Sequence, residues 1–297
     1  MPRYILPGGS GFLGRSFAAY ARSLGHECVV LTRRPSREGD LPWDGKTVGP
    51  WRKVLEGAEA VVNFTGKSVN CVYTPENRKE IIDSRVDSVR VVDEAIAGCA
   101  RPPMVIVQSG SLAIYGDTTE PCDEDAPHGE GFGAEVCELW EAAFFQNTLP
   151  ETRKCMLRIG FVLGPDGGAL VPLRTLTRYF LGGTVGSGRQ YISWLHVEDL
   201  NRMIQRCIED ENLDGIFNAT NPHPITNNVF MRAMRKAMRR PWSPPAPAFI
   251  VKIGARWILK TEASLALTGR KCYPRRLEEV GFTFLHTDLE ATLREVL

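Results

Sequence analysis

The sequence predicts an α/β protein: a doubly wound parallel sheet with a smaller α+β cap built from the C-terminal portion. Short apolar runs alternate with helical patterns through the first half of the chain. Such alternation implies parallel strands that are covered by helices on both faces. A glycine-rich turn joins the first run to the first helical pattern, as in Rossmann-type folds. We therefore expect a dinucleotide-binding domain over residues 1–160, to which segments near 190–220 return, and mainly a substrate-binding cap over residues 161–297.

The expected strands are short and rich in β-branched and other apolar residues, and turn-forming or polar residues bound them. In chain order they are Arg3–Leu6, Cys28–Leu31, Ala60–Phe64, Met104–Gln108 and Cys155–Ile159. Because the carboxyl ends of parallel strands share one edge of the sheet, the residues that follow these runs are the candidates for ligand binding.

Three helical patterns lie between these strands. The pattern of Phe12–Leu24 follows the glycine turn directly. Thr74 before Pro75 is typical of an N-cap with proline at the first helical position, and it predicts a helix that runs towards Cys99. In Ala134–Phe145 the apolar residues recur at helical spacing and predict one stripe that faces the core, made of Val136, Leu139, Trp140, Ala143 and Phe144.

After about residue 160 the pattern becomes looser and glycine-rich loops appear. The segment Gly186–Gln190 is a candidate to close over a substrate, with Arg189 as a candidate anion clamp. We expect His196 to fix a loop that leads into a helix from Asp199, with Asp199 as a candidate N-cap; a substrate contact of His196 is the less favoured reading. Four prolines within 241–247 interrupt the chain before a last helical and irregular stretch.

The glycine turn reads Gly8-x-x-Gly11-x-x-Gly14, with Ser10, Phe12 and Leu13 inside it. A strand that turns through glycines into a helix offers free backbone N–H groups and the positive end of the helix dipole to a pyrophosphate. The spacing differs from the G-x-G-x-x-G fingerprint, but its place at the first strand–helix turn is where dinucleotides bind.

The end of the second strand favours NADP(H) over NAD(H). The run ends in Thr32-Arg33-Arg34, with no acidic residue at the strand end. A carboxylate at this point hydrogen-bonds the ribose 2′-hydroxyl of NAD, whereas arginine accommodates the 2′-phosphate of NADP. Guanidinium groups offer bidentate, charge-assisted hydrogen bonds to such a phosphate.

Composition excludes several other classes of protein. Lys and Arg number 36 against 35 Asp and Glu, so no global field attracts nucleic acid or an anionic membrane. The eight cysteines include no CxxC pair, and we predict no metal site and a reducing, cytoplasmic location. No apolar run is long enough to span a bilayer. The basic residues within 232–240 have the spacing of an amphipathic helix whose charged face is exposed to solvent. We consider it less favoured that this cluster binds a nucleic acid or a partner from the division machinery.

At this point the chain resembles the extended short-chain dehydrogenase/reductase superfamily. The motifs, besides the glycine turn, are Asn63-Phe64-Thr65-Gly66, Ser111-x-x-x-Tyr115-Gly116-Asp117 and Trp194–Leu200. It is most similar to the branch of "epimerase family" proteins that have been called cell-division-inhibitor-like, and this resemblance spans nearly the whole chain. The motifs of that branch are Glu80–Arg85, Arg158–Gly164, Leu267–Pro274 and Gly281-Phe282.

The resemblance implies an NADP-type cofactor that lies across the strand ends. The turn from Gly8 to Gly14 would hold the pyrophosphate, and Thr32 with the following arginines would meet the 2′-phosphate. The remaining positions that the resemblance assigns to the cofactor are Phe64, Thr65, Gly66, Glu80, Arg85 and Phe161. Members of the superfamily are often homodimers.

The catalytic motif of that superfamily is incomplete here. Its chemistry uses a tyrosine and, four residues later, a lysine that lowers the pKa of the phenol, with a serine to orient the substrate oxygen. Ser111 is present, but the tyrosine and lysine positions fall on Gly133 and Cys137. No tyrosine occurs between Tyr115 and residue 179, and no lysine between residues 79 and 154.

Three readings of the chemistry stay open. Tyr115 acts as proton donor beside Ser111, which suits a reductase better than an epimerase; another acid such as Glu141 substitutes; or the chain binds NADP(H) without turnover and serves as a sensor or scaffold. A reactive Cys137 is less favoured, because a lone helical cysteine is usually a small apolar filler. The first two make the protein an oxidoreductase or isomerase that acts on a small polar carbonyl or sugar-like substrate.

Overall fold

A seven-stranded parallel sheet forms the centre of the computed structural model, which describes residues 1–297 except for the side chains of residues 258 and 259. The strand order is β11-β7-β5-β4-β1-β2-β3, and order reverses between β1 and β4. The strands are β1 (Arg3–Pro7), β2 (Glu27–Thr32), β3 (Leu41–Pro42), β4 (Ala60–Asn63), β5 (Val105–Ser111), β7 (Arg153–Ile159) and β11 (Gly215–Ala219). All their pairings are parallel.

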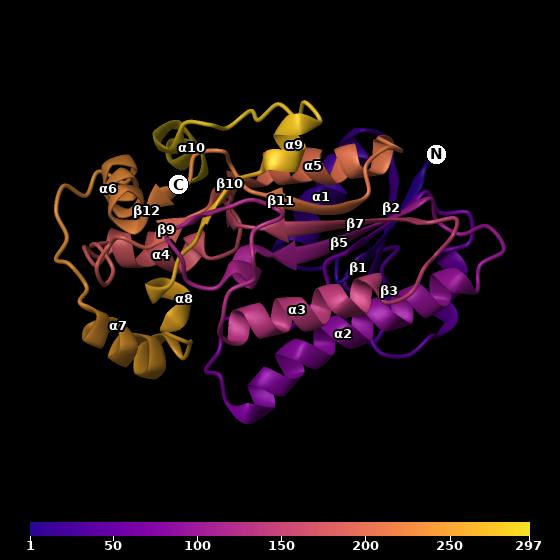
Figure 1. Cartoon of the computed structure of the whole chain (residues 1–297), viewed down its shortest axis with the longest axis horizontal. Coiled ribbons are helices and arrows are strands. Elements are labelled where there is room, and N and C mark those ends of the chain that lie inside the picture. Colours follow the sequence, from indigo (N-terminus) through magenta and orange to yellow (C-terminus); the bar gives the residue numbers. More distant parts are fainter.

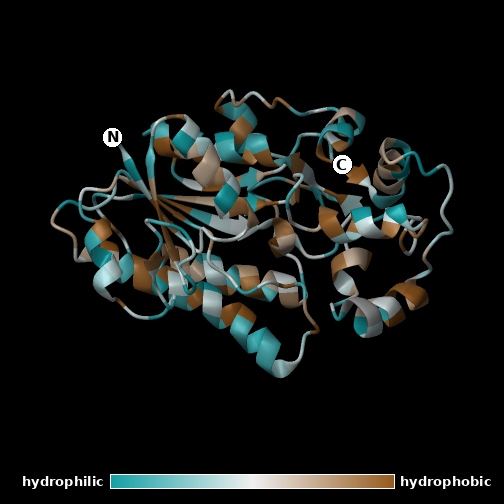
Figure 2. Cartoon of the chain, turned by 180° about the vertical axis from the view of Figure 1, so that it is seen from behind, coloured by the Kyte–Doolittle hydropathy of each residue, from teal (hydrophilic) through white to brown (hydrophobic). Residues whose placement is uncertain are grey.

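Helices cover both faces of the sheet, which confirms the doubly wound α/β prediction (Figure 1). On one face α1 (Phe12–Ser23) and α5 (Val197–Glu209) enclose an apolar core with the sheet. On the other face α2 (Pro75–Ala97) and α3 (Phe132–Phe145) enclose a second core. In Figure 2 the strands are mainly brown or white, whereas the flanking helices alternate hydrophobic and hydrophilic residues, as expected for helices with one buried face.

The cap is built from short elements. Its strands pair two by two: β8 (Phe161–Leu163) with β10 (Trp194–His196), β9 (Tyr191–Ile192) with β12 (Ile225–Thr226), and β6 (Pro121–Cys122) with β13 (Lys271–Cys272). Its helices are α4 (Leu170–Arg178), α6 (Asn227–Ala237), α7 (Ala248–Gly254), α8 (Ser264–Leu267), α9 (Arg275–Glu279) and α10 (Leu289–Val296). The single turns η1 (Pro50–Val54), η2 (Leu112–Tyr115) and η3 (Ala255–Leu259) complete the chain.

The chain returns to the central sheet after it first enters the cap. Helix α5 packs on the same face as α1, and β11 extends the sheet beside β7. Residues 197–219 thus lie against and within the central sheet, although they follow the first cap elements in the chain. Thr74 caps α2 by accepting a hydrogen bond from the Asn77 N–H (3.2 Å), with Pro75 at the first helical position.

One part of the predicted core stripe on α3 is wrong. Val136, Trp140 and Phe144 are buried, but Leu139 is 45% exposed. It lines a shallow surface groove between α2 and α3, because it lies just beyond the arc of α3 that faces the sheet.

No helix among the described residues is both long and apolar enough to cross a membrane.

Candidate cofactor and substrate site

The glycine turn is shaped by close backbone contacts that exclude side chains. Gly8 has a φ of +70°, and a Cβ there would lie 2.8 Å from the Cα of Thr65. A Cβ on Gly14 would collide with the backbone of Gly9. Glycine at these positions lets β1 turn sharply into α1 and lets the helix pack directly on the turn.

The N-terminus of α1 is open. Its N-cap, Gly11, provides no side-chain cap, and the first turn contains no acidic residue. A Cβ on Gly11 would meet only the Gly8 carbonyl oxygen, at 3.8 Å, so there is free space beside it. The first-turn N–H groups, which have no partner within a helix, therefore fit a pyrophosphate at this cradle.

The end of β2 fits a 2′-phosphate. The Thr32 side chain is buried, and its hydroxyl donates a hydrogen bond to the Ser10 Oγ (3.0 Å), which ties the strand end to the glycine turn. Arg33 and Arg34 follow it and are exposed. Among the described side chains neither forms an ion pair, so both guanidinium groups are free to bind an anion.

The end of β4 adds the third side of the cradle. The Thr65 Oγ1 is buried beside Gly8 and has no hydrogen-bond partner among the described atoms. Gly66 packs against Arg85, because a Cβ on it would lie 3.1 Å from the guanidinium carbon. The Arg85 Nη1 donates to the carbonyl oxygens of Lys67 (3.1 Å) and Ile81 (2.9 Å), so α2 holds this guanidinium against the loop after β4.

Other predicted cofactor residues lie at this edge, but their side chains contact protein groups. Glu80 pairs with Lys67. A Cβ on Gly164 would meet the Phe12 ring, which packs under the loop after β8, and Leu13 and Phe64 pack against the core. The Phe161 ring makes an edge contact with that of Phe230, with centroids 5.6 Å apart.

Ser111 lies at the end of β5 and starts the single turn η2. Its Oγ accepts a hydrogen bond from the Ala113 N–H (3.2 Å), which leaves its own hydroxyl hydrogen available as a donor. Gly133, at the tyrosine position of the superfamily, faces this turn, since a Cβ there would lie 3.4 Å from that of Ala113. Cys137, at the lysine position, is buried, and burial raises the pKa of its thiol to about 12.

Tyr115 is enclosed in a buried polar network. Its hydroxyl donates to the Asn218 Oδ1 (2.8 Å) and accepts from the Arg158 Nη1 (2.7 Å), and only 2% of the residue is exposed. Burial raises the pKa of this phenol well above its usual value, although Arg158 opposes the shift. These contacts disfavour Tyr115 as a proton donor.

Glu141 belongs to the same network. Its two carboxylate oxygens accept from the Nε (2.9 Å) and Nη2 (2.8 Å) of Arg158, in a bidentate ion pair. The pair is sealed, so Glu141 does not face a ligand either. The hydrogen-bonded pairs of this network are separated by 17 to 103 residues in the chain, so no local spacing in the sequence indicates the role of Arg158.

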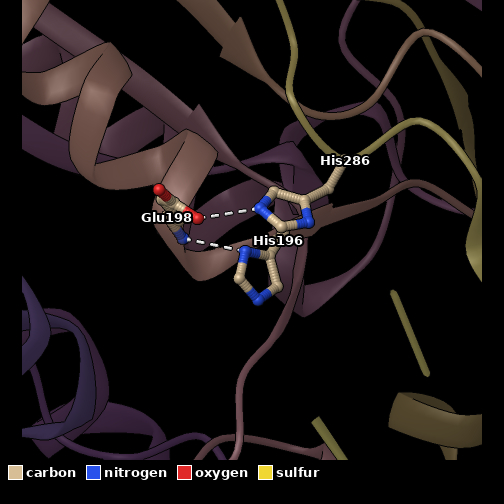
Figure 3. A group of neighbouring side chains, drawn as sticks. All are labelled: His196, Glu198 and His286. Carbon is tan, nitrogen blue, oxygen red and sulfur yellow. Dashed lines mark hydrogen bonds and ion pairs between the residues drawn. The ribbon is translucent and has the colours of Figure 1, made fainter. Parts of the chain in front are cut away.

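A second cluster joins the start of α5 to the C-terminal segment (Figure 3). His196 is the N-cap of α5, and its Nδ1 accepts from the Glu198 N–H (3.3 Å). The His286 ring lies tilted against it at 39°, with centroids 3.8 Å apart, and its Nε2 approaches a Glu198 carboxylate oxygen (2.8 Å). The three side chains place possible ligand atoms within 4.8 Å of one another, and the His196 Nδ1 and the His286 Nε2 each have a protein partner.

The position of Asp199 corrects one expectation. The helix begins at Val197 with His196 as its cap, and Asp199 does not cap it. The Asp199 carboxylate instead accepts from the backbone N–H groups of Leu285 (2.9 Å) and His286 (3.0 Å).

Comparison with protein families gives two matches. Residues 4–219 match the NAD dependent epimerase/dehydratase family, and residues 246–296 match a domain of unknown function, DUF1731. The chain is 32% identical to the epimerase family protein SDR39U1 of Bos taurus, with 99% of both chains covered. It is also 32% identical to the chloroplastic SDR39U1 homolog of Arabidopsis thaliana, over 98% of this chain and 85% of that protein.

Two solved structures are similar over the full length of the chain. The crystal structure of human epimerase family protein SDR39U1 (isoform 2) with NADPH has a TM-score of 0.89 and 29% identity, covering 99% of this chain and 98% of that one. A nucleoside-diphosphate sugar epimerase from Corynebacterium glutamicum has a TM-score of 0.81 and 27% identity, covering 100% of this chain and 58% of that one.

Proposed function

The chain belongs to the NAD dependent epimerase/dehydratase family, and from this premise we propose that it is an NADP(H)-dependent oxidoreductase or isomerase. Its substrate in this proposal is a small polar carbonyl or sugar-like compound. The eight cysteines are all free thiols, which is compatible with a cytoplasmic location.

The observation that carries the cofactor assignment is the pair of exposed, unpaired arginines after β2. Arg33 and Arg34 extend from the strand whose end is tied to the glycine turn through Thr32 and Ser10. A 2′-phosphate bound there would receive charge-assisted hydrogen bonds. The human relative that was crystallised with NADPH supports the same choice.

Ser111 is the group best placed to act on the substrate. When bound, the nicotinamide would supply or accept a hydride. The Ser111 hydroxyl, oriented by the Ala113 N–H, can donate its hydrogen to a substrate carbonyl and so stabilise negative charge that develops on that oxygen. Reduction of a carbonyl needs such a donor, whereas epimerisation needs an efficient base. Gly133 and Cys137, which occupy the tyrosine and lysine positions of the superfamily, cannot act as that base.

Calorimetric titration of the purified protein with NADPH and with NADH tests the cofactor assignment. We expect NADPH to bind more tightly, and Arg33→Ala to weaken NADPH binding by about 10- to 100-fold while NADH binding changes little. Arg37→Ala, on the same exposed loop, is the matched control. Equal affinities for the two cofactors, or equal losses in both variants, would contradict the assignment.

Binding without turnover is the second candidate function. The sealed phenol of Tyr115 and the glycine at the tyrosine position favour it. Oxidation of NADPH with a panel of aldehydes and ketones separates the two. Sustained turnover that Ser111→Ala reduces by at least about tenfold supports the enzyme; NADPH binding with no turnover on any carbonyl supports a sensor or scaffold.

A further inference from the structure

Helix α7 presents large apolar side chains to solvent instead of to a core. None of its residues is buried, and its main contacts are with η3, the turn that continues it directly. Phe249 is 65% exposed, Ile253 58% and Trp257 74%, and Ile250 is 49% exposed. Single exposed apolar side chains are ordinary, but a contiguous group of them on one element marks an interaction site.

These four side chains share one side of the helix, which we call the α7 apolar face. Phe249, Ile253 and Trp257 follow one another at intervals of four residues, and Ile250 precedes Ile253 by three, spacings that place side chains on the same side of a helix. Ala255 is buried, and its position between Ile253 and Trp257 turns it about 200° away from each of them. The α7 apolar face therefore points away from the protein body, the reverse of the usual arrangement in a surface helix.

Basic residues border the α7 apolar face. Lys252 and Arg256 are exposed and directly precede Ile253 and Trp257 in the chain. In the described part of the chain neither of them forms an ion pair. From residue 215 to residue 261 the sequence contains no acidic residue and eight basic ones, which are Arg232, Arg235, Lys236, Arg239, Arg240, Lys252, Arg256 and Lys260. Although the charges of the whole chain are balanced, this part of the cap carries a strong positive excess.

The end of α6 holds most of that excess. A surface cavity of about 410 Å³ is lined there by Arg232, Arg235, Lys236, Arg239 and Arg240. Among the described side chains only Lys236 of this group has a carboxylate partner, Glu290 (2.7 Å). The remaining guanidinium groups are therefore not neutralised within the protein, and their field attracts anionic groups to this end of the cap.

The segment between α6 and α7 is fixed to the loop that follows α4. The Arg240 Nε donates to the Arg178 carbonyl oxygen (3.2 Å), and the Arg240 guanidinium lies 5.0 Å from the centroid of the half-exposed Phe180 ring. Farther along, the Ala246 N–H donates to the Thr184 carbonyl oxygen (2.8 Å). Helix α7 therefore leaves the cap from a defined point, and Figure 1 shows it at the end of the molecule opposite the N-terminus.

An anionic membrane surface fits this combination of side chains. Interfacial helices place Trp, Phe and other apolar side chains at the boundary between headgroups and acyl chains, while Lys and Arg stay with the headgroups. A second copy of the chain fits less well. A two-fold dimer through this face would bring the same basic residues together, and residues 215–261 offer no carboxylate to pair with them.

We propose that the α7 apolar face, flanked by Lys252 and Arg256, binds the surface of an anionic phospholipid bilayer. The helix lies in the interface with Phe249, Ile253 and Trp257 among the lipids, and it does not span the bilayer. The basic residues at the end of α6 supply the longer-range attraction. This inference goes beyond the proposed function and does not depend on NADP(H) binding.

Co-sedimentation of the whole protein with phospholipid vesicles tests the proposal. We expect saturable binding to phosphatidylcholine vesicles that contain about a quarter phosphatidylserine, and at least about tenfold weaker binding to phosphatidylcholine alone. Binding should weaken as salt is added, because salt screens the attraction. Ile253→Glu, which places a carboxylate in the α7 apolar face, should weaken binding by at least about tenfold. The double change Lys252→Gln and Arg256→Gln should weaken it by about 10- to 30-fold, since each basic residue near the surface contributes about fivefold.

Matched controls come from the sheet domain. Leu24→Glu changes a residue that is 49% exposed at the end of α1, and the double change Arg52→Gln and Lys53→Gln removes two exposed charges from η1. Both controls should bind vesicles as the unchanged protein does, and unchanged thermal unfolding shows that each variant is folded.

Three results would overturn the proposal. The first is no binding to anionic vesicles at low ionic strength, and the second is equal binding by all variants. The third is a concentration-dependent dimer, measured by sedimentation velocity without vesicles, that Ile253→Glu abolishes. That result would assign the α7 apolar face to a second copy of the chain.

Discussion

At the scale of single residues, Tyr115 shows how a motif residue can serve the fold. Its hydroxyl bridges Arg158 and Asn218, and these two residues come from β7 and β11. The phenol therefore helps to hold three adjacent elements, β5 with its turn, β7 and β11, at the edge where the substrate would bind. The spacing of Ser111 and Tyr115 can be read directly from the sequence. The hydrogen-bond partners of the Tyr115 hydroxyl could not be predicted, because Arg158 and Asn218 are distant from it in the chain.

Tyr115→Phe should therefore lower stability and leave cofactor affinity intact. Removal of the hydroxyl leaves the Arg158 Nη1 and the Asn218 Oδ1 short of a partner, and we expect the free energy of unfolding to fall by about 1–3 kcal/mol. Urea unfolding measures this, and an NADPH titration checks binding. Tyr191→Phe, a half-buried tyrosine with no described hydroxyl bond, is the control. Loss of turnover with unchanged stability would instead restore Tyr115 as the proton donor.

The Arg158–Glu141 pair gives a sharper stability prediction. Both side chains are less than a tenth exposed, and removal of one charge leaves the other buried without compensation. We expect Glu141→Gln to lower the free energy of unfolding by about 3–5 kcal/mol. Glu138→Gln, one turn earlier on α3 and half exposed, should change it by less than about 1 kcal/mol. Similar small effects of both changes would contradict a sealed pair.

His196 should make stability fall in mild acid. Burial lowers the pKa of its imidazole, and the adjacent His286 lowers it further, while Glu198, Asp199 and Glu295 act in the opposite direction. Because the folded pKa lies below the unfolded value of about 6.5, the contribution is complete above that pH. It is lost as the pH falls through the folded pKa, since the unfolded chain then binds the extra proton.

Urea unfolding at intervals between about pH 8 and pH 5 measures this dependence. In His196→Asn the side chain remains a good N-cap for α5 but does not titrate. We expect the decline in unfolding free energy below about pH 6.5 to be shallower in the variant than in the unchanged protein. Identical slopes would assign the acid sensitivity to other groups.

At the scale of elements, the strand–turn–helix unit at the N-terminus was the best predicted part. The expected helix Phe12–Leu24 differs from α1 by one residue at its end, because glycine spacing and apolar periodicity both act locally. The two-residue strands of the cap were not predictable. Cys122 and Cys272, for example, are register partners in β6 and β13, a pairing that depends on tertiary contacts and carries no periodic signal.

Within this strand–turn–helix unit, we expect Gly14 to be needed for folding and Gly11 to be needed for cofactor binding. A Cβ on Gly14 collides with the Gly9 backbone, whereas a Cβ on Gly11 has open space. We expect Gly14→Ala to lower the free energy of unfolding by about 1–3 kcal/mol. Gly11→Ala should cost less than about 1 kcal/mol but should weaken NADPH binding, because its methyl group would occupy the cradle. Thermal unfolding with and without NADPH distinguishes the two effects, and equal stability losses would contradict this division.

At the scale of the whole molecule, the sequence indicated two regions, but the structure ties them together. The cap helix α10 packs against α6 through Leu293 and Val296. Just before it, the segment 283–286 is hydrogen-bonded to α5, the helix that packs on the central sheet beside α1. The sequence could not show this return, since Asp199 and His286 are far apart in the chain and their bonds involve backbone N–H groups, which carry no residue signature.

This return predicts that the two regions unfold as one. The Asp199 carboxylate satisfies two backbone donors of the C-terminal segment and pairs with Arg202 (3.1 Å). We expect circular dichroism and tryptophan fluorescence to report coincident transitions. Asp199→Ala should lower the free energy of unfolding by about 2–5 kcal/mol, whereas Asp288→Asn, which preserves an exposed N-cap, should have little effect. If Asp199→Ala instead produced an early transition confined to the cap, with NADPH still protecting the later one, the cap would be an independent unit that merely rests on the sheet domain.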